Sequence, residues 1–222
     1  MAAVKTRKTR REPATPAKRG TGVQLGSDVA RNMIMFGATR VFVTKGFRAV
    51  SVEDLLEAGQ VSRRTFYRFF KSKDDVALAM YTLGTSSLVE SVRRAIAKDQ
   101  DLLGQLERCI DIHLSNAQQM GRLVYVLGGE AQSLESPLYA RRIEVHDMLV
   151  DMFKTEASTV DPLLIRALVI ALEQITRVVL QEGDEGRRVT PAAIARARAV
   201  MLRIATGTVA GHGARVSPMP TL

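Results

Sequence analysis

Five helix starts can be recognised in this sequence from their capping chemistry. Ser51 precedes Val-Glu-Asp and Ser72 precedes Lys-Asp-Asp, so each predicts a capping box. In such a box the serine hydroxyl accepts from a backbone amide of the first turn, and the aspartate carboxylate accepts from the backbone amide of the serine. Ser136-Pro137, Asp161-Pro162 and Thr190-Pro191 each place a capping oxygen before a proline at the first helical position. The apolar residues between these starts fall at helical spacing and not in the alternation of strands. We therefore predict an all-α fold.

The positive charge of the chain is concentrated in its first third. The net charge is +9. Residues 1–26 hold seven Lys and Arg against one acid, residues 27–72 hold eight against four, and residues 73–222 hold 17 against 18. This distribution is expected if the first third meets a polyanion and the remainder does not. The alternative is a basic tail that only aids solubility.

Composition also divides the chain. Residues 1–26 are rich in Lys, Arg, Thr, Pro and Gly and poor in large apolar residues, which predicts a disordered basic arm. Residues 207–222 contain Gly and Pro without periodicity and are expected to be a flexible tail. Between these ends, charge separates a basic part, residues 27–72, from a nearly neutral part, residues 73–206.

The first two predicted helices lead to a turn. A helix from about Asp28 to Lys45 would bury one face and stop at Gly46. A short helix from Val52 to about Ala58 would follow, with Gly59 as a turn residue able to adopt positive φ. The buried face of the first helix would consist of Ile34, Gly37, Ala38, Val41 and Phe42, and that of the second of Leu55 and Leu56. This layout indicates a helix-turn-helix.

The third predicted helix, residues 63–70, has two chemically different faces. Phe66 and Phe70 are four residues apart and should face the core together. The outward side would carry Arg63, Arg64, Tyr67 and Arg68. Guanidinium forks suit guanine edges and phosphates, and a tyrosine hydroxyl suits a phosphate oxygen. The helix is therefore predicted to present cations to nucleic acid.

These residues carry a family resemblance. The stretch SVEDLLEAGQVSRRTFYRFFKSK, residues 51–73, with RNMIMFGATRVFVTKGF before it, resembles the DNA-binding domain of TetR-type transcriptional regulators. The matching positions are Ser51, Ala58, Gly59, Val61, Ser62, Thr65, Phe66, Tyr67, Phe70, Ser72 and Lys73. Gln60 is an extra residue in the turn, Arg64 replaces a small residue, and Phe69 stands where a histidine is usual.

The resemblance covers about a quarter of the chain and implies an architecture for the rest. It implies a helix-turn-helix DNA-binding domain over residues 27–72 and a helical domain for effector binding and dimerisation over residues 73–206. There would be about nine helices in all, with a dimer formed largely by the last two and a ligand cavity among the middle ones. In the helix-turn-helix, Arg63 and Arg64 would read base edges, with Arg68 beside them. The DNA backbone would be positioned by Ser51, Ser62, Thr65, Tyr67 and Lys73, and the basic arm would add phosphate or minor-groove contacts.

The last two predicted helices have the composition of an interface. The helix from Pro162 is apolar on more than one side, and the helix from Pro191 has small residues that permit close approach. The apolar positions are Leu164, Ala167, Leu168, Ile170, Ala171, Ile175, Val178 and Val179, and the small-residue helix contributes Ala195, Ala199, Leu202 and Ala205. We expect a symmetric homodimer on a palindromic operator of double-stranded DNA. The alternative is that these residues fill a monomeric core.

Five polar residues interrupt apolar stretches and are candidates for contact with an unidentified small-molecule effector: His113, Tyr125, Glu173, Gln174 and Arg177. Polar groups inside a helical bundle can orient a ligand. The alternative for each is pairing with a neighbour or exposure at the surface.

Catalytic chemistry is not indicated. His113, His146 and His212 lack metal-ligand spacing, and the lone Cys109 allows neither a zinc cluster nor an intrachain disulfide. There is no phosphate-binding loop and no nucleophile elbow. We expect no cofactor and no metal. No apolar run reaches the roughly 18 residues of a membrane span, and no signal peptide is recognisable, so we expect a cytoplasmic protein.

The sequence therefore predicts a dimeric regulator of transcription, a repressor that a small molecule releases from its operator. Two other classes remain open. One is an architectural DNA-binding protein without a ligand, and the other is an interaction protein whose helix-turn-helix is only a bundle element.

Overall fold

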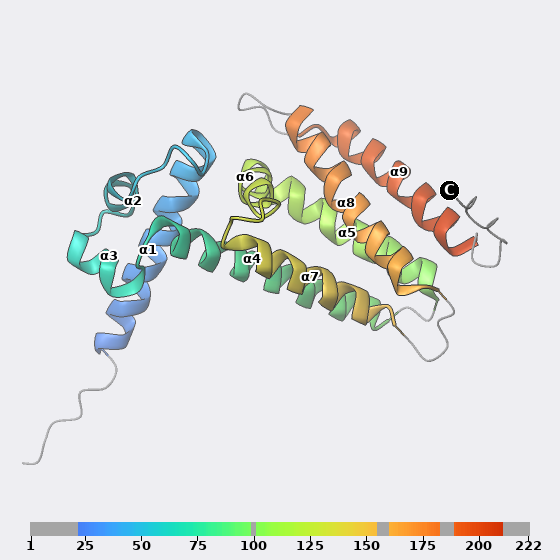
Figure 1. Cartoon of the computed structure of the whole chain (residues 1–222), viewed down its shortest axis with the longest axis horizontal. Coiled ribbons are helices and arrows are strands. Elements are labelled where there is room, and N and C mark those ends of the chain that lie inside the picture. The colour runs from blue at the N-terminus through green and yellow to red at the C-terminus, as the bar shows by residue number, and fades with distance from the viewer. Residues whose placement is uncertain (1–21, 99–100, 155–159, 183–188, 211–222) are drawn as a thin grey trace, which may run out of the picture.

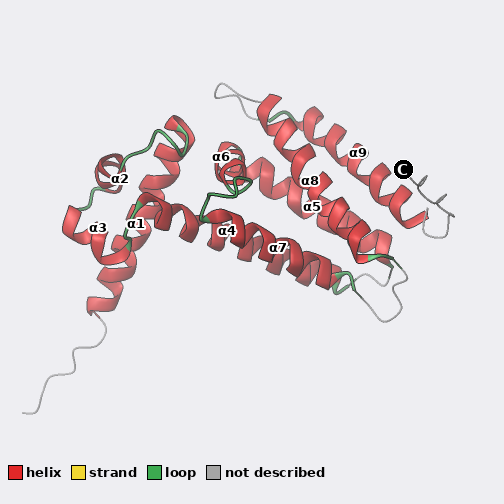
Figure 2. Ribbon diagram, in the orientation of Figure 1, coloured by secondary structure: helices red, strands yellow, loops and turns green. Residues whose placement is uncertain are grey.

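The computed structural model describes residues 22–98, 101–154, 160–182 and 189–210. In these ranges the chain forms helices joined by loops, without a strand (Figure 2). The helices are α1 (Gly22–Lys45), α2 (Val52–Gly59), α3 (Arg63–Phe69), α4 (Lys73–Ile96), α5 (Leu102–Met120), α6 (Arg122–Glu130), α7 (Leu138–Met152), α8 (Pro162–Glu182) and α9 (Pro191–Ala210). The predicted all-α fold is confirmed.

Ser51 forms the complete capping box that the sequence predicts. Its hydroxyl accepts from the amide of Asp54 at 3.2 Å, and the Asp54 carboxylate accepts from the amide of Ser51 at 2.9 Å. Lys45, at the end of α1, adds an ion pair to Asp54 at 2.6 Å. These contacts, that with Lys45 first, lower the pKa of Asp54 to about 2. The start of α2 is thereby tied to the end of α1.

At Ser72 only half of the predicted box is present. Its hydroxyl accepts from the amide of Asp75 at 3.2 Å, but the Asp75 carboxylate accepts from Lys71, one residue further back. The difference arises because the chain enters α4 from a bend in which the amide of Lys71 faces the helix end.

Two of the three predicted starts before proline carry their caps, whereas α7 has Pro137 at its N-cap position and no side-chain cap. Asp161 accepts from Leu163 at 2.8 Å, and Thr190 accepts from Ala193 at 3.2 Å, so α8 and α9 begin at the proline. Ser136 accepts from Leu138 at 3.2 Å, and α7 begins there, one residue later than the pattern predicts.

Two glycines let α1 and α2 cross with their backbones in contact. A Cβ on Gly37 would lie 2.5 Å from the carbonyl carbon of Ala58, and one on Gly59 would lie 3.1 Å from the Cα of Ile34. The prediction that Gly59 is the positive-φ turn residue is wrong, because Gln60 occupies that position with φ 51°. Gly46 does end α1 as predicted, with φ 76°.

The helices form two groups joined by α4 (Figure 1). The first three helices gather at one end, and α4 leaves them to run alongside α5 and α7, with α8 and α9 packed beyond. The N-terminal core surrounds Phe42, Leu55 and Phe66, all fully buried. It also includes Leu123 and Leu127 of α6, so α6 belongs to both groups.

The helices extend beyond the limits that composition suggests. α1 begins at Gly22, so residues 22–26, which were expected to be part of the arm, are helical. α9 continues to Ala210, so residues 207–210 are helical and not part of a tail. The rest of the predicted arm and tail, and His212, lie outside the described residues.

The glycine crossing can be tested by adding a single methyl group. We expect Gly37→Ala to lower the free energy of unfolding by about 1–3 kcal/mol, because the new Cβ meets backbone atoms that cannot move aside. The matched control is Gly26→Ala in the same helix, where a Cβ meets nothing within 4 Å. That control should be neutral or stabilising by up to about 1 kcal/mol. Denaturant unfolding followed by circular dichroism measures both, and equal stabilities would contradict the close crossing.

Candidate nucleic-acid interface and ligand cavity

α3 is held to the N-terminal core by its phenylalanines. Phe66 is fully buried and Phe70, just after the helix, is 4% exposed. Their ring centroids lie 6.1 Å apart, and the guanidinium of Arg31 in α1 lies 5.5 Å from the Phe70 ring. A helix of two turns is not stable alone, so these contacts are what give α3 a fixed position.

The opposite side of α3 is exposed and cationic. Arg63, Arg64, Tyr67 and Arg68 are all exposed, as the sequence predicts. Tyr67 packs edge-on against Phe66 at 5.4 Å, which fixes the ring while its hydroxyl stays in water. Three guanidinium groups thus stand on one rigid face, a suitable arrangement for phosphates and base edges.

Arg63 has a partner within the protein. It forms an ion pair with Glu53 of α2, and both side chains are more than half exposed. Exposed pairs contribute little to stability because solvent screens them. The guanidinium can therefore exchange this carboxylate for a nucleic-acid group at little cost.

Three of the residues predicted to contact the DNA backbone, Ser51, Ser62 and Thr65, form hydrogen bonds at helix starts. Ser51 caps α2, as described above, and Ser62 caps α3 by accepting from the amide of Thr65 at 3.1 Å. The hydroxyls of Ser62 and Thr65 are also 2.8 Å apart. All three lie at the starts of α2 and α3, where backbone amides and helix dipoles favour a phosphate.

Lys73 has a structural role that the sequence did not indicate. Its ammonium donates to the carbonyls of Phe47, Arg48 and Val50 at 3.0–3.1 Å, and it lies 4.8 Å from the Phe47 ring. All three of its protons are thus used within the protein. We revise its role from a phosphate contact to the group that holds the loop between α1 and α2.

Removing this ammonium should destabilise the domain. We expect Lys73→Met to lower the free energy of unfolding by about 1–3 kcal/mol, because three carbonyls lose their donor. Lys71→Met, on an exposed side chain two residues away, is the matched control and should change little. Thermal unfolding of both variants measures the difference. If Lys73→Met unfolds at the same temperature as the wild type, Lys73 has no structural role and the prediction that it contacts a DNA phosphate stands again.

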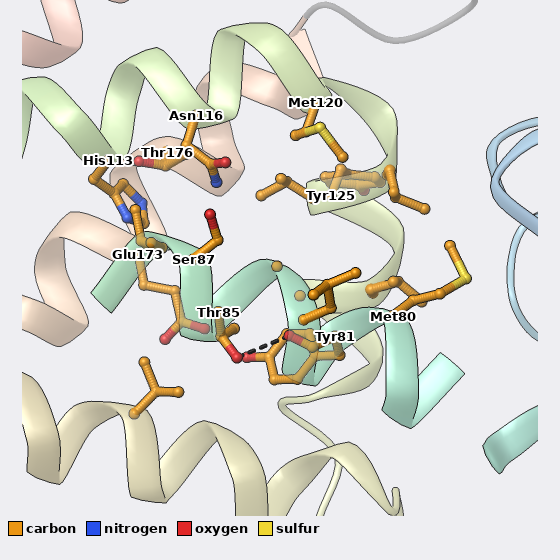
Figure 3. A pocket seen from close by; sticks show the side chains of 18 of the residues that line it. Met80, Tyr81, Thr85, Ser87, His113, Asn116, Met120, Tyr125, Glu173 and Thr176 are labelled. Carbon is orange, nitrogen blue, oxygen red and sulfur yellow. Dashed lines mark hydrogen bonds between the residues drawn. The ribbon is translucent and has the colours of Figure 1, made fainter. Parts of the chain in front are cut away.

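A cavity of about 780 Å³ lies in the second group of helices. Residues of α1, α4, α5, α6, α7 and α8 line it, and most of the lining is apolar. Figure 3 shows Met80, Met120 and Tyr125 on one side of it and His113, Thr176 and Glu173 on the other. This size and composition are typical of small-molecule sites.

Glu173 is the centre of a partly buried polar cluster at the wall. Arg142 of α7 donates to both of its carboxylate oxygens at 2.6–3.0 Å, and Nε2 of His146 lies 3.4 Å away. Burial by itself would raise the pKa of Glu173, but hydrogen bonds from His146 and Arg142 outweigh it and lower the pKa to about 2. The carboxylate therefore stays charged and is neutralised within the protein.

Three polar side chains of the cavity wall, those of Gln132, His113 and Thr176, have a buried atom without a hydrogen-bond partner in the described part of the chain, and the last two lie beside this cluster. Nε2 of His113 and Oγ1 of Thr176 are buried without a hydrogen bond. Burial lowers the pKa of His113 to about 4, a shift that the Glu173 charge opposes and His146 supports. At neutral pH the imidazole is uncharged and can donate or accept.

Tyr125 and Arg177 form a second polar part of the wall. The Arg177 guanidinium lies 4.7 Å from the Tyr125 ring and donates to the Tyr125 carbonyl at 3.2 Å. Gly129 makes room for it, because a Cβ there would lie 2.3 Å from a guanidinium nitrogen. Among the described residues Arg177 has no carboxylate partner, so its charge is available to the cavity.

Four of the five predicted effector residues line the cavity, and Gln174 does not. Gln174 is exposed. Its neighbour Glu173 faces inward, and one residue along a helix turns the side chain by about 100°. Sequence reasoning did not identify Thr176 or Arg142 as residues of this site. Thr176 is three residues from Glu173 and so shares its face, whereas Arg142 has no local signal.

The outer faces of α8 and α9 are apolar and exposed. On α8 the exposed stripe consists of Leu163, Ala167, Ile170, Gln174 and Val178, and on α9 Val200 and Ile204 are exposed. The prediction that Ala205 allows close approach of a partner is not supported, because it is fully buried in the core of its own chain. Ala195 and Ala199 are exposed and remain candidates for close contact with a partner subunit.

Residues 34–80 match the model of the family described as bacterial regulatory proteins, tetR family. This range runs from the buried side of α1 through the glycine crossing, α3 and the Lys73 contact. The N-terminal part of this chain is therefore similar to proteins of that family.

Similar proteins include TetR-type regulators over more of the chain. The HTH-type transcriptional activator FasR of Mycolicibacterium smegmatis is 25% identical over 142 residues, which are 63% of this chain and 62% of that protein. FadR from Bacillus subtilis, solved in complex with stearoyl-CoA, has a TM-score of 0.65 and 16% identity, covering 79% of this chain and 98% of that one. A tetR-family protein from Rhodococcus RHA1 has a TM-score of 0.63 and 18% identity, covering 79% and 96%. The two structural likenesses show the shared fold.

Nothing in the comparisons or the site points to an enzyme. Within the described ranges, no three His, Cys, Asp or Glu side chains gather where they could hold a metal ion. Cys109 is buried, and burial raises the pKa of its thiol to about 12. Of the helices that the structure describes, none is long and apolar enough to span a membrane.

Proposed function

We propose that this protein is a TetR-type, DNA-binding regulator of transcription that works as a homodimer and responds to a small molecule. The observation that carries the proposal is the rigid cationic face of α3. Arg63, Arg64 and Arg68 stand exposed on a helix whose position is fixed by Phe66 and Phe70. We propose that Arg63 and Arg64 read base edges and that Tyr67, Ser51, Ser62 and Thr65 contact the DNA backbone.

The dimer would form through the exposed apolar faces of α8 and α9. Leu163, Ile170 and Val178 lie along α8 at intervals of seven and eight residues, so they form one stripe. An exposed apolar stripe of this kind marks an interaction surface. With two-fold symmetry it would bring two α3 helices to neighbouring major grooves, about 34–36 Å apart, on a palindromic operator.

The cavity has a direct mechanical link to the DNA-binding domain. Met35, Phe36 and Thr39 of α1 form part of its wall. At the start of α6, Nε of Arg122 donates to the carbonyl of Val43 in α1 at 2.6 Å, and Arg48 lies 3.5 Å from Glu130 at the end of α6. A ligand that displaces α1 or α6 would therefore change the angle at which α3 is presented.

We propose that the protein is a repressor and that the ligand releases it. Release requires only that the ligand bind more tightly to the conformer with mismatched α3 spacing. The ligand is proposed to contain an acyl or other long apolar chain. The apolar wall supports this class, and so does the structurally similar regulator that was solved with stearoyl-CoA. The relative FasR is named as an activator, so the opposite sign is the specific competing outcome.

DNA binding is tested by fluorescence anisotropy on fragments that tile the region upstream of the protein's own gene, over a salt series. We expect one palindromic fragment to bind at least about a thousandfold more tightly than the rest. Arg63→Ala with Arg64→Ala should weaken that binding by at least about tenfold, because two guanidinium contacts are lost. Arg93→Ala with Arg94→Ala, an exposed pair near the far end of α4, is the matched control and should bind normally.

The other outcomes of this measurement are informative. Uniform binding that fades steeply with salt would identify an architectural protein that uses α3 without reading sequence. Unchanged affinity of the Arg63 and Arg64 variant would mean that α3 does not contact DNA.

Dimerisation is tested by light scattering on the purified protein. We expect a mass twice that of the 24.4 kDa chain, and dissociation to monomer in Ile170→Glu, because a charge would be buried at the centre of the stripe. Leu134→Glu is the control. Leu134 is 78% exposed but lies between α6 and α7, away from the stripe. A dimer that withstands Ile170→Glu and is disrupted by Leu134→Glu would place the interface elsewhere.

A further inference from the structure

We infer that the cavity recognises a ligand through an uncharged oxygen, a hydroxyl or a carbonyl, seated between His113 and Thr176 on an otherwise apolar molecule. The inference rests on the proposed function, since it names the chemistry of the ligand for that same cavity. It follows from two unpartnered atoms, from the charge balance around them, and from the lining of the remaining space.

The unpartnered atoms are buried deeply enough to need a partner. Thr176 is 3% exposed, and neither its hydroxyl nor Nε2 of His113 has a hydrogen bond. Leaving such a group unsatisfied costs free energy, which a ligand oxygen would recover. Both residues line the cavity, and Figure 3 shows them at the same end of it. Thr176 is one helical turn from Glu173, and the Glu173 charge acts on His113, so the two lie near the same carboxylate.

Thr85 provides the contrast. It lines the same cavity, but its hydroxyl donates to the carbonyl of Tyr81 at 2.8 Å. A threonine in a helix ordinarily satisfies itself in this way, by bonding the preceding turn. Thr176 does not, and its hydroxyl is therefore available to a bound molecule.

The charges around this pair exclude a ligand carboxylate. Glu173 is ionised, and the Arg142 guanidinium that neutralises it already donates to both of its oxygens. His113 is uncharged at neutral pH, as described above. Burial raises the pKa of Tyr81 to about 12, with a further contribution from Glu173, so the phenol is uncharged as well. A carboxylate beside His113 and Thr176 would face the ionised Glu173. The guanidinium of Arg177, which is available to the cavity, lies against Tyr125 in the other polar part of the wall. A hydroxyl or carbonyl between His113 and Thr176 needs no cation.

The rest of the wall suits an alkyl chain. Met80 and Met120 lie on the side opposite His113 and Thr176 (Figure 3). The apolar lining also includes Val169, Leu172, Leu83 and Phe36 of α1. Leu83 and Met120 are exposed, so an alkyl chain in the cavity would cover apolar surface. The ligand class is therefore a fatty alcohol, ketone, ester or thioester, and not a free fatty acid bound by its carboxylate at His113.

The test compares two ligands of equal chain length in the full-length protein. Displacement of the neutral dye Nile red would report the affinity of decanol and of decanoate at neutral pH. We expect decanol to bind at least about tenfold more tightly than decanoate. Thr176→Val and His113→Phe, which keep the shape and remove the hydrogen-bonding atoms, should each weaken decanol about three- to tenfold and leave decanoate within about twofold. Thr85→Val is the matched control and should leave both affinities unchanged.

Each other result contradicts the inference. Equal affinity for the two probes, or unchanged decanol affinity in both variants, would mean that the two atoms are satisfied by water or serve only the fold. Failure of either probe to displace the dye would mean that the cavity takes no alkyl ligand. Thermal unfolding of each variant verifies that a lost affinity is not a lost fold.

Operator binding, measured on the same samples, separates this inference from the proposed function. Decanol that binds through Thr176 but leaves operator affinity unchanged would support the inference and contradict ligand release. Decanoate that binds as tightly as decanol and releases the operator would contradict the inference and support ligand release.

Discussion

The backbone contact between α1 and α2 is the constraint on which the rest of the protein depends. Gly37 and Gly59 let the two helices approach until a single added Cβ would meet backbone atoms. This approach brings Ser51 and Asp54 to the end of α1, where Lys45 completes the cap, and it leaves α3 resting on α1 through Phe66. The positions of the exposed arginines of α3 therefore depend on the crossing of α1 and α2, although no arginine of α3 takes part in that crossing. The proposed recognition of DNA thus depends on Gly37 and Gly59, which allow the two helix backbones to come into contact.

α1 also connects the two parts of the proposed function. Its buried face holds the helix-turn-helix, while Met35, Phe36 and Thr39 form part of the cavity wall. α6 packs into the N-terminal core through Leu123 and Leu127 and lines the cavity with the same residues. A molecule in the cavity would touch helices that also position α3. This shared packing is a physical route by which occupancy and DNA affinity could depend on one another, as linkage requires.

The prediction of site residues succeeded where a local pattern decides the side-chain direction. Phe66 and Phe70 are four apart, so their burial and the exposure of Arg63 and Arg64 follow from helical geometry. The same rule applied to α8 would have paired Glu173 with Thr176 and excluded Gln174. It could not have found Arg142 or the role of Lys73. Arg142 reaches Glu173 from another helix, and Lys73 bonds carbonyls more than twenty residues earlier, and only folding brings such groups together.

The sequence by itself determined the starting residues of α2, α4, α8 and α9 and the cationic face of α3, because capping and helical periodicity act over a few residues. It also carries the resemblance to the tetR family, because the matching residues are contiguous between 34 and 80. The tertiary structure alone decided what Gly59 and Lys73 do, which side chain neutralises Glu173, and where a cavity of about 780 Å³ lies. Those properties depend on how helices cross. Crossing is set by contacts between residues far apart in the chain, which no local pattern records.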